Sequence, residues 1–431
     1  MRIARKSPRR ALRLLASGVA VVLTACGTPQ TSTPSPSATP SLTAPSPSAG
    51  PPTPTPNPSD VYKTIEDQVV AIRQLQPKST IEPHVLDPTE LKQRVEESFK
   101  KENPPEIVHA NEQLYKGMGL FPADASLEDL FIELQSSQVA GFYDSDTKQL
   151  YVVSKTGNLG PTERVTFAHE YTHALQDQNF DLNTFDVSEV GEGDRGLGRL
   201  SLIEGDATAV MSIWAQQNLD TFELLQLTQE ASDPDALRIL QSLPAILRET
   251  TLFPYQQGLQ FVLTLQAAGG ETAVDRAFKE PPASSEQVIH FDKYQAHEKP
   301  IQLTVRKDIA AKMGPGWRTS LQDTLGEFQT DIWLRADGAN DISTADNAAA
   351  GWGGDRVVLL EGPNGAWAIG WLTVWDTPRD ASEFRAAAAS AIDAYRIPAS
   401  SVGPLQGSKQ TILMAGNDAA LDRLSTALGL P

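Results

Sequence analysis

The chain has 431 residues, 40% of them hydrophobic, which suggests two or three globular domains once targeting segments are set aside. Its formal net charge of −18 argues against nucleic acid as a partner and against electrostatic docking on anionic lipid. A single cysteine, Cys26, excludes an intrachain disulfide and a metal site built from cysteines.

Residues 1–25 have the pattern of a bacterial export signal. A basic start is followed by the apolar run 11–23, which is too short to predict a permanent membrane span. The run ends in Leu-Thr-Ala-Cys, a sequence that resembles the lipobox of bacterial lipoproteins. The resemblance implies a lipid thioether on Cys26 and a protein anchored at the cell envelope, outside the cytoplasm. An exported protein with an incidental cysteine is the alternative.

Residues 26–60 are predicted to be a disordered tether. After Cys26 the segment consists almost entirely of Pro, Ser, Thr and Ala, so it cannot bury enough apolar surface to fold. An extended chain of this kind would reach up to roughly 100 Å at about 3.1 Å per residue. Such a tether would hold the rest of the protein clear of a membrane.

The next stretch, 61–137, is expected to be mainly helical, because apolar residues recur three and four positions apart in 60–73, 87–101 and 127–134. The pattern then changes to a β-hairpin over 139–154, where two β-branched and aromatic runs flank Asp-Ser-Asp-Thr-Lys-Gln. This hairpin either aligns an extended substrate by backbone hydrogen bonds or is purely structural.

The segment after the hairpin contains His169, Glu170 and His173 in the pattern H-E-x-x-H. On a helix the two histidines lie one turn apart on one face, where both imidazoles reach a single zinc ion. Glu170 would then polarise a zinc-bound water. The helix is expected to start with Thr162 as its N-cap. Two polar histidines on the surface of an amphipathic helix are the alternative.

A second helix is predicted over 197–219, and Glu204 lies within its apolar frame. A carboxylate on a second helix, facing the two histidines, would complete a His/His/Glu zinc site. Glu192 is the competing ligand. Because glycines flank Glu192 and place it in a loop, we prefer Glu204.

The motifs H-E-Y-T-H-A-L-Q-D-Q and L-I-E-G-D-A resemble the gluzincin metallopeptidases, the clan of thermolysin-like and aminopeptidase-like enzymes. Over residues 130–295 the chain is more closely similar to uncharacterised bacterial secreted proteins with P-Y-x-x-G and P-P-x-S-x-E-Q-x-x-H segments. The resemblance implies a zincin-like domain over 61–300, a peptide or protein substrate and Zn²⁺ as cofactor. It also implies roles for four residues: His169, His173 and Glu204 as zinc ligands and Glu170 as general base.

One position departs from the thermolysin-like pattern. Four residues after the ligand Glu, those enzymes carry an Asp that supports a ligand histidine, whereas this chain has Thr208. What supports the ligand histidines is therefore left open.

Further helices are expected over 235–248, 257–268 and 271–278, with Gly-Gly at 269–270 as a stop. A tetrahedral intermediate needs a hydrogen-bond donor opposite the metal. The candidates for that role are Tyr255, His290 and Tyr294, each of which has a structural role as its alternative.

Residues 301–431 are expected to form a separate, small α+β module. The predicted elements are strands over 357–360 and 366–375, a helix over 380–395, a strand over 410–415 and a helix over 418–428. The glycine-rich segment 350–355 is predicted to be a turn, because it lacks the Lys and the following helix of a phosphate loop. The module shows no catalytic constellation.

The sequence thus predicts an α+β, mostly helical protein: a zincin-like metallopeptidase domain with a β-hairpin before the H-E-x-x-H helix, followed by the C-terminal module. The expected function is hydrolysis of peptide bonds by a membrane-anchored zinc enzyme outside the cytoplasm. The alternative is a non-catalytic zincin-fold lipoprotein for binding or envelope assembly. A purely structural zinc site is less favoured, because such sites usually use four protein ligands.

Overall fold

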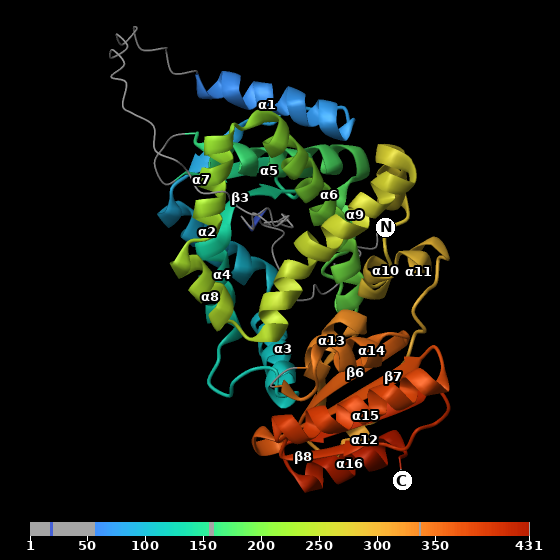
Figure 1. Cartoon of the computed structure of the whole chain (residues 1–431). Helices are drawn as coiled ribbons and strands as arrows, with labels where there is room; N and C mark the ends of the chain where they lie inside the picture. Colours follow the sequence, from blue (N-terminus) through green and yellow to red (C-terminus); the bar gives the residue numbers. More distant parts are fainter. Residues whose placement is uncertain (1–17, 20–56, 155–158, 336–337, 431) are drawn as a thin grey trace, which may run out of the picture.

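The computed structural model describes residues 18–19, 57–154, 159–335 and 338–430 (Figure 1). The predicted signal sequence and tether, Cys26 included, lie outside these residues except for 18–19 and 57–60. The fold is α+β and mostly helical, with a four-stranded and a five-stranded sheet, so the expected fold class is confirmed at this level. Within the described ranges, no helix has the length and apolar character needed to cross a membrane.

The first helices begin where the sequence supplies proline or a capping side chain. They are α1 (Pro58–Arg73), α2 (Pro88–Glu102), α3 (Pro105–Gly117) and α4 (Leu127–Gln138). Proline begins α1, α2 and α3, where its missing N–H costs nothing because the first N–H groups of a helix have no partner within the helix. The side chains of Asp87 and Ser126 accept hydrogen bonds from such N–H groups at the starts of α2 and α4. The expectation of a mainly helical 61–137 is confirmed.

The first sheet has the strand order β1-β3-β4-β2. The expected hairpin is present, because β3 (Val139–Asp144) and β4 (Gln149–Val153) pair antiparallel. On one side, β2 (Pro83–Leu86) pairs parallel with β4. On the other, β1 (Gly18–Val19) pairs antiparallel with β3. The outer edge of β3 therefore accepts an extended segment.

Three long helices form the centre of the N-terminal lobe, the name used here for residues 57–300 (Figure 1). They are α5 (Pro161–Phe180), α6 (Gly193–Asn218) and α9 (Ala245–Lys279). Helix α5 packs on β3, β4 and α6, and α6 packs along α9. The predicted N-cap of α5 is wrong: Gly160 is the N-cap and Pro161 opens the helix, so Thr162 lies in the first turn.

Glycine lets α6 and α9 approach closely. A Cβ atom on Gly205 would lie 2.2 Å from the carbonyl oxygen of Gly258, and one on Gly258 would lie 2.2 Å from the carbonyl oxygen of Ser201. Further along α9, Gly269 and Gly270 leave the helical conformation, with φ +62° at Gly270, which confirms the predicted stop as a break. Shorter helices complete the lobe: α7 (Thr221–Ala231), α8 (Pro234–Ser242), α10 (Ser285–Ile289) and α11 (Phe291–Gln295).

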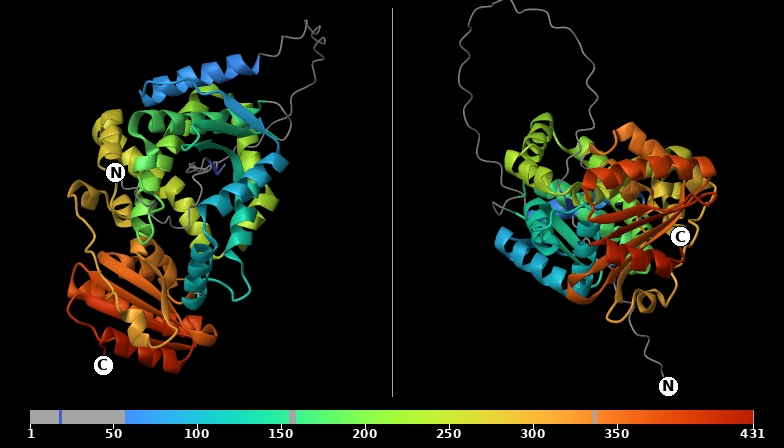
Figure 2. Two further views of the ribbon diagram at one scale, coloured as in Figure 1. Left: turned by 180° about the vertical axis from the view of Figure 1, so that it is seen from behind. Right: turned by 90° about the horizontal axis from the view of Figure 1, so that it is seen from below.

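The C-terminal lobe, residues 301–430, contains the second sheet, an antiparallel sheet of order β5-β6-β7-β9-β8 (Figure 2). Its strands are β5 (Arg318–Asp323), β6 (Trp352–Glu361), β7 (Trp367–Trp375), β8 (Ala399–Val402) and β9 (Lys409–Ala415). Its helices are α12 (Ile309–Met313), α13 (Gly326–Arg335), α14 (Ile342–Ala349), α15 (Pro378–Tyr395) and α16 (Asp418–Leu428). The predicted strands and helices are all present, but β6 begins at Trp352, so the turn predicted over 350–355 is confined to 350–351 and its remainder is strand.

Helices cover both faces of this sheet because its central strands are apolar on both sides. Val357 and Leu359 of β6 pack toward α13, α14 and α15, whereas Val358 and Leu360 pack toward α12 and α16. The first of these clusters continues into the N-terminal lobe, where it includes Leu114 of α3. The indole nitrogen of Trp333 donates to the backbone oxygen of Met118 at 3.1 Å across the same boundary. One hydrophobic core therefore joins the two lobes.

Candidate metal centre

Helices α5 and α6 bring His169, His173 and Glu204 together in the interior of the N-terminal lobe. The Nε2 atoms of the two histidines are 3.1 Å apart. Oε2 of Glu204 lies 3.2 Å from Nε2 of His169 and 3.4 Å from Nε2 of His173. All three side chains are buried. Two imidazole nitrogens and a carboxylate oxygen that converge in this way could hold one metal ion.

The competing ligand, Glu192, lies elsewhere. It is the N-cap residue of α6 and forms ion pairs with Arg195 and Arg356, each at 3.6 Å. Glu204 is about three turns further along the same helix. Of the two carboxylates, the one in the apolar helical frame is thus the one that faces the histidines.

Charges within the cluster favour a cation. Burial raises the pKa of Glu204, but His173 and His169 outweigh burial and lower it to about 2. Burial lowers the pKa of His173, but the Glu204 carboxylate outweighs burial and raises it to about 9. Glu204 therefore keeps its negative charge at neutral pH, and protons compete with a metal ion for the His173 imidazole.

Glu170, next to the first histidine, is completely buried. No described side chain donates a hydrogen bond to its carboxylate oxygens, and of the described hydrogen-bond donors only the backbone N–H of Tyr143 comes near enough to lower its pKa. Burial raises the pKa of this carboxyl group, while His169 and His173 act in the opposite direction. A buried carboxylate with so few hydrogen bonds costs stability, and a raised pKa makes it a better proton acceptor, so the arrangement suits a general base.

The candidate oxyanion donors lie in different places. The Tyr255 ring stacks on the His169 ring with centroids 6.3 Å apart, so this tyrosine borders the metal cluster. His290 instead forms a pair with Glu327 of α13, with Nε2 and Oε1 2.8 Å apart. The Tyr294 hydroxyl donates to the backbone oxygen of Glu280 at 3.0 Å. Of the three candidates, Tyr255 is the one whose ring stacks on a histidine of the cluster.

The edge of β3 runs beside the general-base candidate. A Cβ atom on Gly141 would lie 3.4 Å from Cγ of Glu170 and 2.7 Å from Cγ2 of Thr166 on α5, so the absence of a side chain lets the strand pass close to the helix. Gly18 of β1 is the register partner of Gly141. An extended segment on this edge therefore passes close to Glu170.

The structure answers the question that the sequence left open about support for the histidines. Nδ1 of His173 lies 2.9 Å from Oε1 of Gln176, whereas the Thr208 hydroxyl has no hydrogen-bond partner among the described residues. Sequence reasoning missed Gln176. Its position three residues after His173, on the same helical face, was the signal that could have found it.

A second group of carboxylates, Glu286, Glu298 and Asp376, also lies close together. The ammonium group of Lys293 lies 2.6 Å from Glu286, 2.6 Å from Asp376 and 3.2 Å from Glu298. Lysine already supplies the cation for this group, which we interpret as a charged contact between the lobes.

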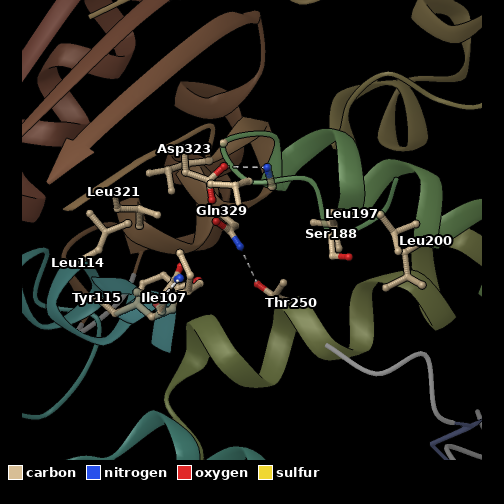
Figure 3. A pocket seen from close by; sticks show the side chains of 16 residues that line it. Ile107, Leu114, Tyr115, Ser188, Leu197, Leu200, Thr250, Leu321, Asp323 and Gln329 are labelled. Atoms are coloured by element: carbon tan, nitrogen blue, oxygen red, sulfur yellow. Dashed lines mark hydrogen bonds between the residues drawn. The ribbon is translucent and has the colours of Figure 1, made fainter. Parts of the chain in front are cut away.

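A cavity of about 100 Å³ lies between the lobes, beside the part of α6 that precedes Glu204 (Figure 3). Leu200 and Leu197 on its wall are one and two turns before Glu204. Its other walls come from α3, α9, β5 and α13, with labelled side chains Ile107, Leu114, Tyr115, Thr250, Leu321, Asp323 and Gln329. Polar groups there bind one another, since Gln329 donates to Thr250 and Gly193 N–H donates to Asp323.

Residues 317–420 match a family described as Domain of unknown function (DUF8575). The match lies within the C-terminal lobe, from the start of β5 into α16, and does not reach α5 or α6. No curated protein and no solved structure matches the chain.

Proposed function

We propose that the protein is a zinc-dependent metallopeptidase with a zincin-like domain over 61–300. His169, His173 and Glu204 would hold Zn²⁺. One observation carries the proposal: the ligand atoms are separated by 3.1, 3.2 and 3.4 Å. Atoms that each lie about 2.0–2.1 Å from one tetrahedral zinc should be about 3.3 Å apart. Three protein ligands also leave a fourth position for water, as in catalytic zinc sites.

Glu170 acts as general base in this proposal. Zinc would supply Lewis-acid polarisation of the scissile carbonyl and of a water molecule. Glu170 takes a proton from the water as its oxygen bonds to the carbonyl carbon. The same carboxyl group returns the proton to the leaving nitrogen as the C–N bond breaks. Tyr255, which stacks on His169, is the preferred donor to the developing oxyanion.

The substrate class is an extended peptide. The outer edge of β3 passes Glu170 and pairs antiparallel with β1, which supports the binding of a peptide backbone there in the same manner. The cavity one to two turns from Glu204 would receive an apolar side chain of the substrate, because Leu197, Leu200 and Leu321 line it.

Lipidation at Cys26 would anchor this enzyme at the bacterial cell envelope, outside the cytoplasm, by way of the Pro/Ser/Thr-rich tether. Expression of the full chain and of Cys26→Ser in a bacterium would test the anchor. We expect the parent in the membrane fraction, extractable by detergent, and the variant outside it. Equal membrane retention of the two would contradict lipid anchoring at this cysteine.

The decisive test of the activity compares the full chain with Glu170→Gln. Both proteins should contain about one zinc per chain, but only the parent should cleave a diverse peptide library. Equal cleavage by the variant would rule out Glu170 as the base. A zinc-containing parent that cleaves nothing would favour the non-catalytic lipoprotein, and a parent without zinc would exclude the metallopeptidase.

A further inference from the structure

A buried chain of hydrogen bonds connects His173 with helix α1. Gln176 donates from Nε2 to the backbone oxygen of Ile203 at 3.0 Å and to Oδ2 of Asp206 at 2.9 Å. Nε of Arg73 donates to the same carboxylate at 2.8 Å. Gln176, Asp206 and the Arg73 side chain are all 0% exposed. These contacts join α5, α6 and α1 directly behind the metal cluster.

The hydrogen bonds of Gln176 determine which ring nitrogen of His173 carries a proton. Both N–H groups of the Gln176 amide face acceptors, so its Oε1 must face His173. An oxygen at that place can only accept, so Nδ1 of His173 is the donor. In a neutral imidazole the other nitrogen, Nε2, is then unprotonated, and this is the atom that faces His169 and Glu204. His169 has no such support, because its Nδ1 lacks a partner among the residues described.

The series of buried hydrogen bonds that starts at His173 ends at the charged guanidinium group of Arg73. Arg73 is the last residue of α1, and its guanidinium also lies 2.8 Å from Asp275 and 3.1 Å from Glu271 on α9. A buried ion cluster is an inefficient way to stabilise helix packing, since desolvation consumes most of the Coulombic gain. What the cation does here is hold the Asp206 carboxylate in place as an acceptor, which in turn holds the Gln176 amide in one orientation.

We propose that Arg73 and Asp206 are positioning residues that act on His173 through Gln176, so that the docking of α1 sets the metal affinity of the site. This inference rests on the metal site of the proposed function but not on its catalytic activity. Asp206 thereby takes over, through an intervening amide, the support that a carboxylate at position 208 would give.

The test measures zinc affinity of the full chain by chelator competition, together with the absorption spectrum of the Co²⁺ form. Gln176→Met, which has similar length but cannot bond to Nδ1, should weaken zinc binding by roughly 10- to 100-fold and alter the Co²⁺ spectrum. Arg73→Lys should weaken it in the same direction. Because the two residues act in series, the double variant should bind zinc no more weakly than Gln176→Met alone.

The matched control is Gln68→Met. Gln68 accepts a hydrogen bond from the indole nitrogen of Trp214 at 2.8 Å, so this change also removes an amide contact between α1 and α6, but one outside the chain to His173. Its zinc affinity should stay within about twofold of the parent, because no metal ligand loses a partner. Should Arg73→Lys fail to fold, Asp206→Asn takes its place, alone and combined with Gln176→Met.

Unchanged zinc affinity in Arg73→Lys, or losses that multiply in the double variant, would overturn the coupling. An equal loss in Gln68→Met would show that loosening of α1 in general, and not the chain to His173, is responsible. A parent that binds no zinc would instead overturn the metal site itself.

Discussion

Gly205 and Gly258 place the backbones of α6 and α9 in direct contact one residue after Glu204. A Cβ atom on Gly205 would lie 2.2 Å from both the carbonyl carbon and the carbonyl oxygen of Gly258, far inside a normal contact. Glycine is unfavourable inside a helix, so its use here has a packing reason. The contact fixes the distance between the helix that carries Glu204 and the helix that carries Tyr255.

Gly205→Ala should therefore destabilise the protein even though alanine is the better helix former. Helix propensity would contribute up to about 1 kcal/mol in favour of the variant, but the clash with backbone atoms should cost more, for a net loss of about 1–3 kcal/mol. Urea unfolding measures the change. Zinc affinity should fall as well, because Glu204 is the preceding residue.

The control is Gly365→Ala, at a position with no atom within 4 Å and φ +74°. Strain there should cost on the order of 1 kcal/mol and leave zinc affinity unchanged. Equal stability of Gly205→Ala and the parent would mean that α6 and α9 separate without cost.

Metal content should distinguish the two candidate carboxylates. Glu204→Ala removes one of three ligand atoms and should abolish stoichiometric zinc binding. Glu192→Ala removes only ion pairs with Arg195 and Arg356 and should retain one zinc per chain. Elemental analysis after dialysis against metal-free buffer provides the measurement. Zinc retained in the first variant and lost in the second would reverse the assignment.

Glu286 should make stability depend on pH. Burial raises its pKa to about 7 despite the neighbouring Lys293, whereas an unfolded chain would show about 4.3. The folded state thus binds the Glu286 proton more tightly than the unfolded state does. The resulting contribution to folding stability is complete below about pH 4 and is lost as the pH rises to about 7. Between pH 4 and 8 the parent should lose up to about 3 kcal/mol relative to Glu286→Gln. Unfolding curves at several pH values measure the difference, and parallel profiles would contradict it.

Asp355 should be essential for the C-terminal lobe. Its carboxylate accepts from the backbone N–H groups of Leu325 and Gly326 and from the indole N–H groups of Trp352 and Trp371, at 2.9 to 3.1 Å. Asp355→Ala would leave four buried donors without an acceptor, at a cost of several kcal/mol. Thermal unfolding measures the loss, and Asp418→Ala, at the exposed start of α16, is the control expected to change little. A melting temperature within a few degrees of the parent would be inconsistent with this role.

Local periodicity was sufficient to predict which side chains converge at the candidate metal centre. Four-residue spacing on one helix defines His169 and His173, and the apolar frame of the second helix distinguishes Glu204 from Glu192. The contacts of Gln176 with Asp206, and of Asp206 with Arg73, could not be predicted from local spacing in the same way. Asp206 is 30 residues away and Arg73 is 133 residues from Asp206, so only the packing of α1 against α6 brings them together.

Strands at the margins of the second sheet were also missed. The sequences of β5 (Arg318–Asp323) and β8 (Ala399–Val402) are largely polar, because each pairs on one side only and is half exposed. The central strands β6 and β7 were predicted because burial on both faces requires long apolar runs. The glycines of 350–355 suggested a turn throughout, but only Gly351 lies in the turn, whereas Gly353 and Gly354 belong to β6, at a β-bulge.

The hydrophobic core that crosses from α3 into the second sheet has a consequence for cooperativity. Separation of the lobes would expose Leu114 and the strand residues it packs with, so neither lobe can melt independently without losing part of its own interior. Heating should give a single endotherm whose calorimetric and van't Hoff enthalpies agree, and two resolved endotherms would contradict this. Hinge bending about residue 300 is disfavoured for the same reason. We therefore expect the cavity between the lobes to keep its shape, so that its lining side chains would decide which groups fit it.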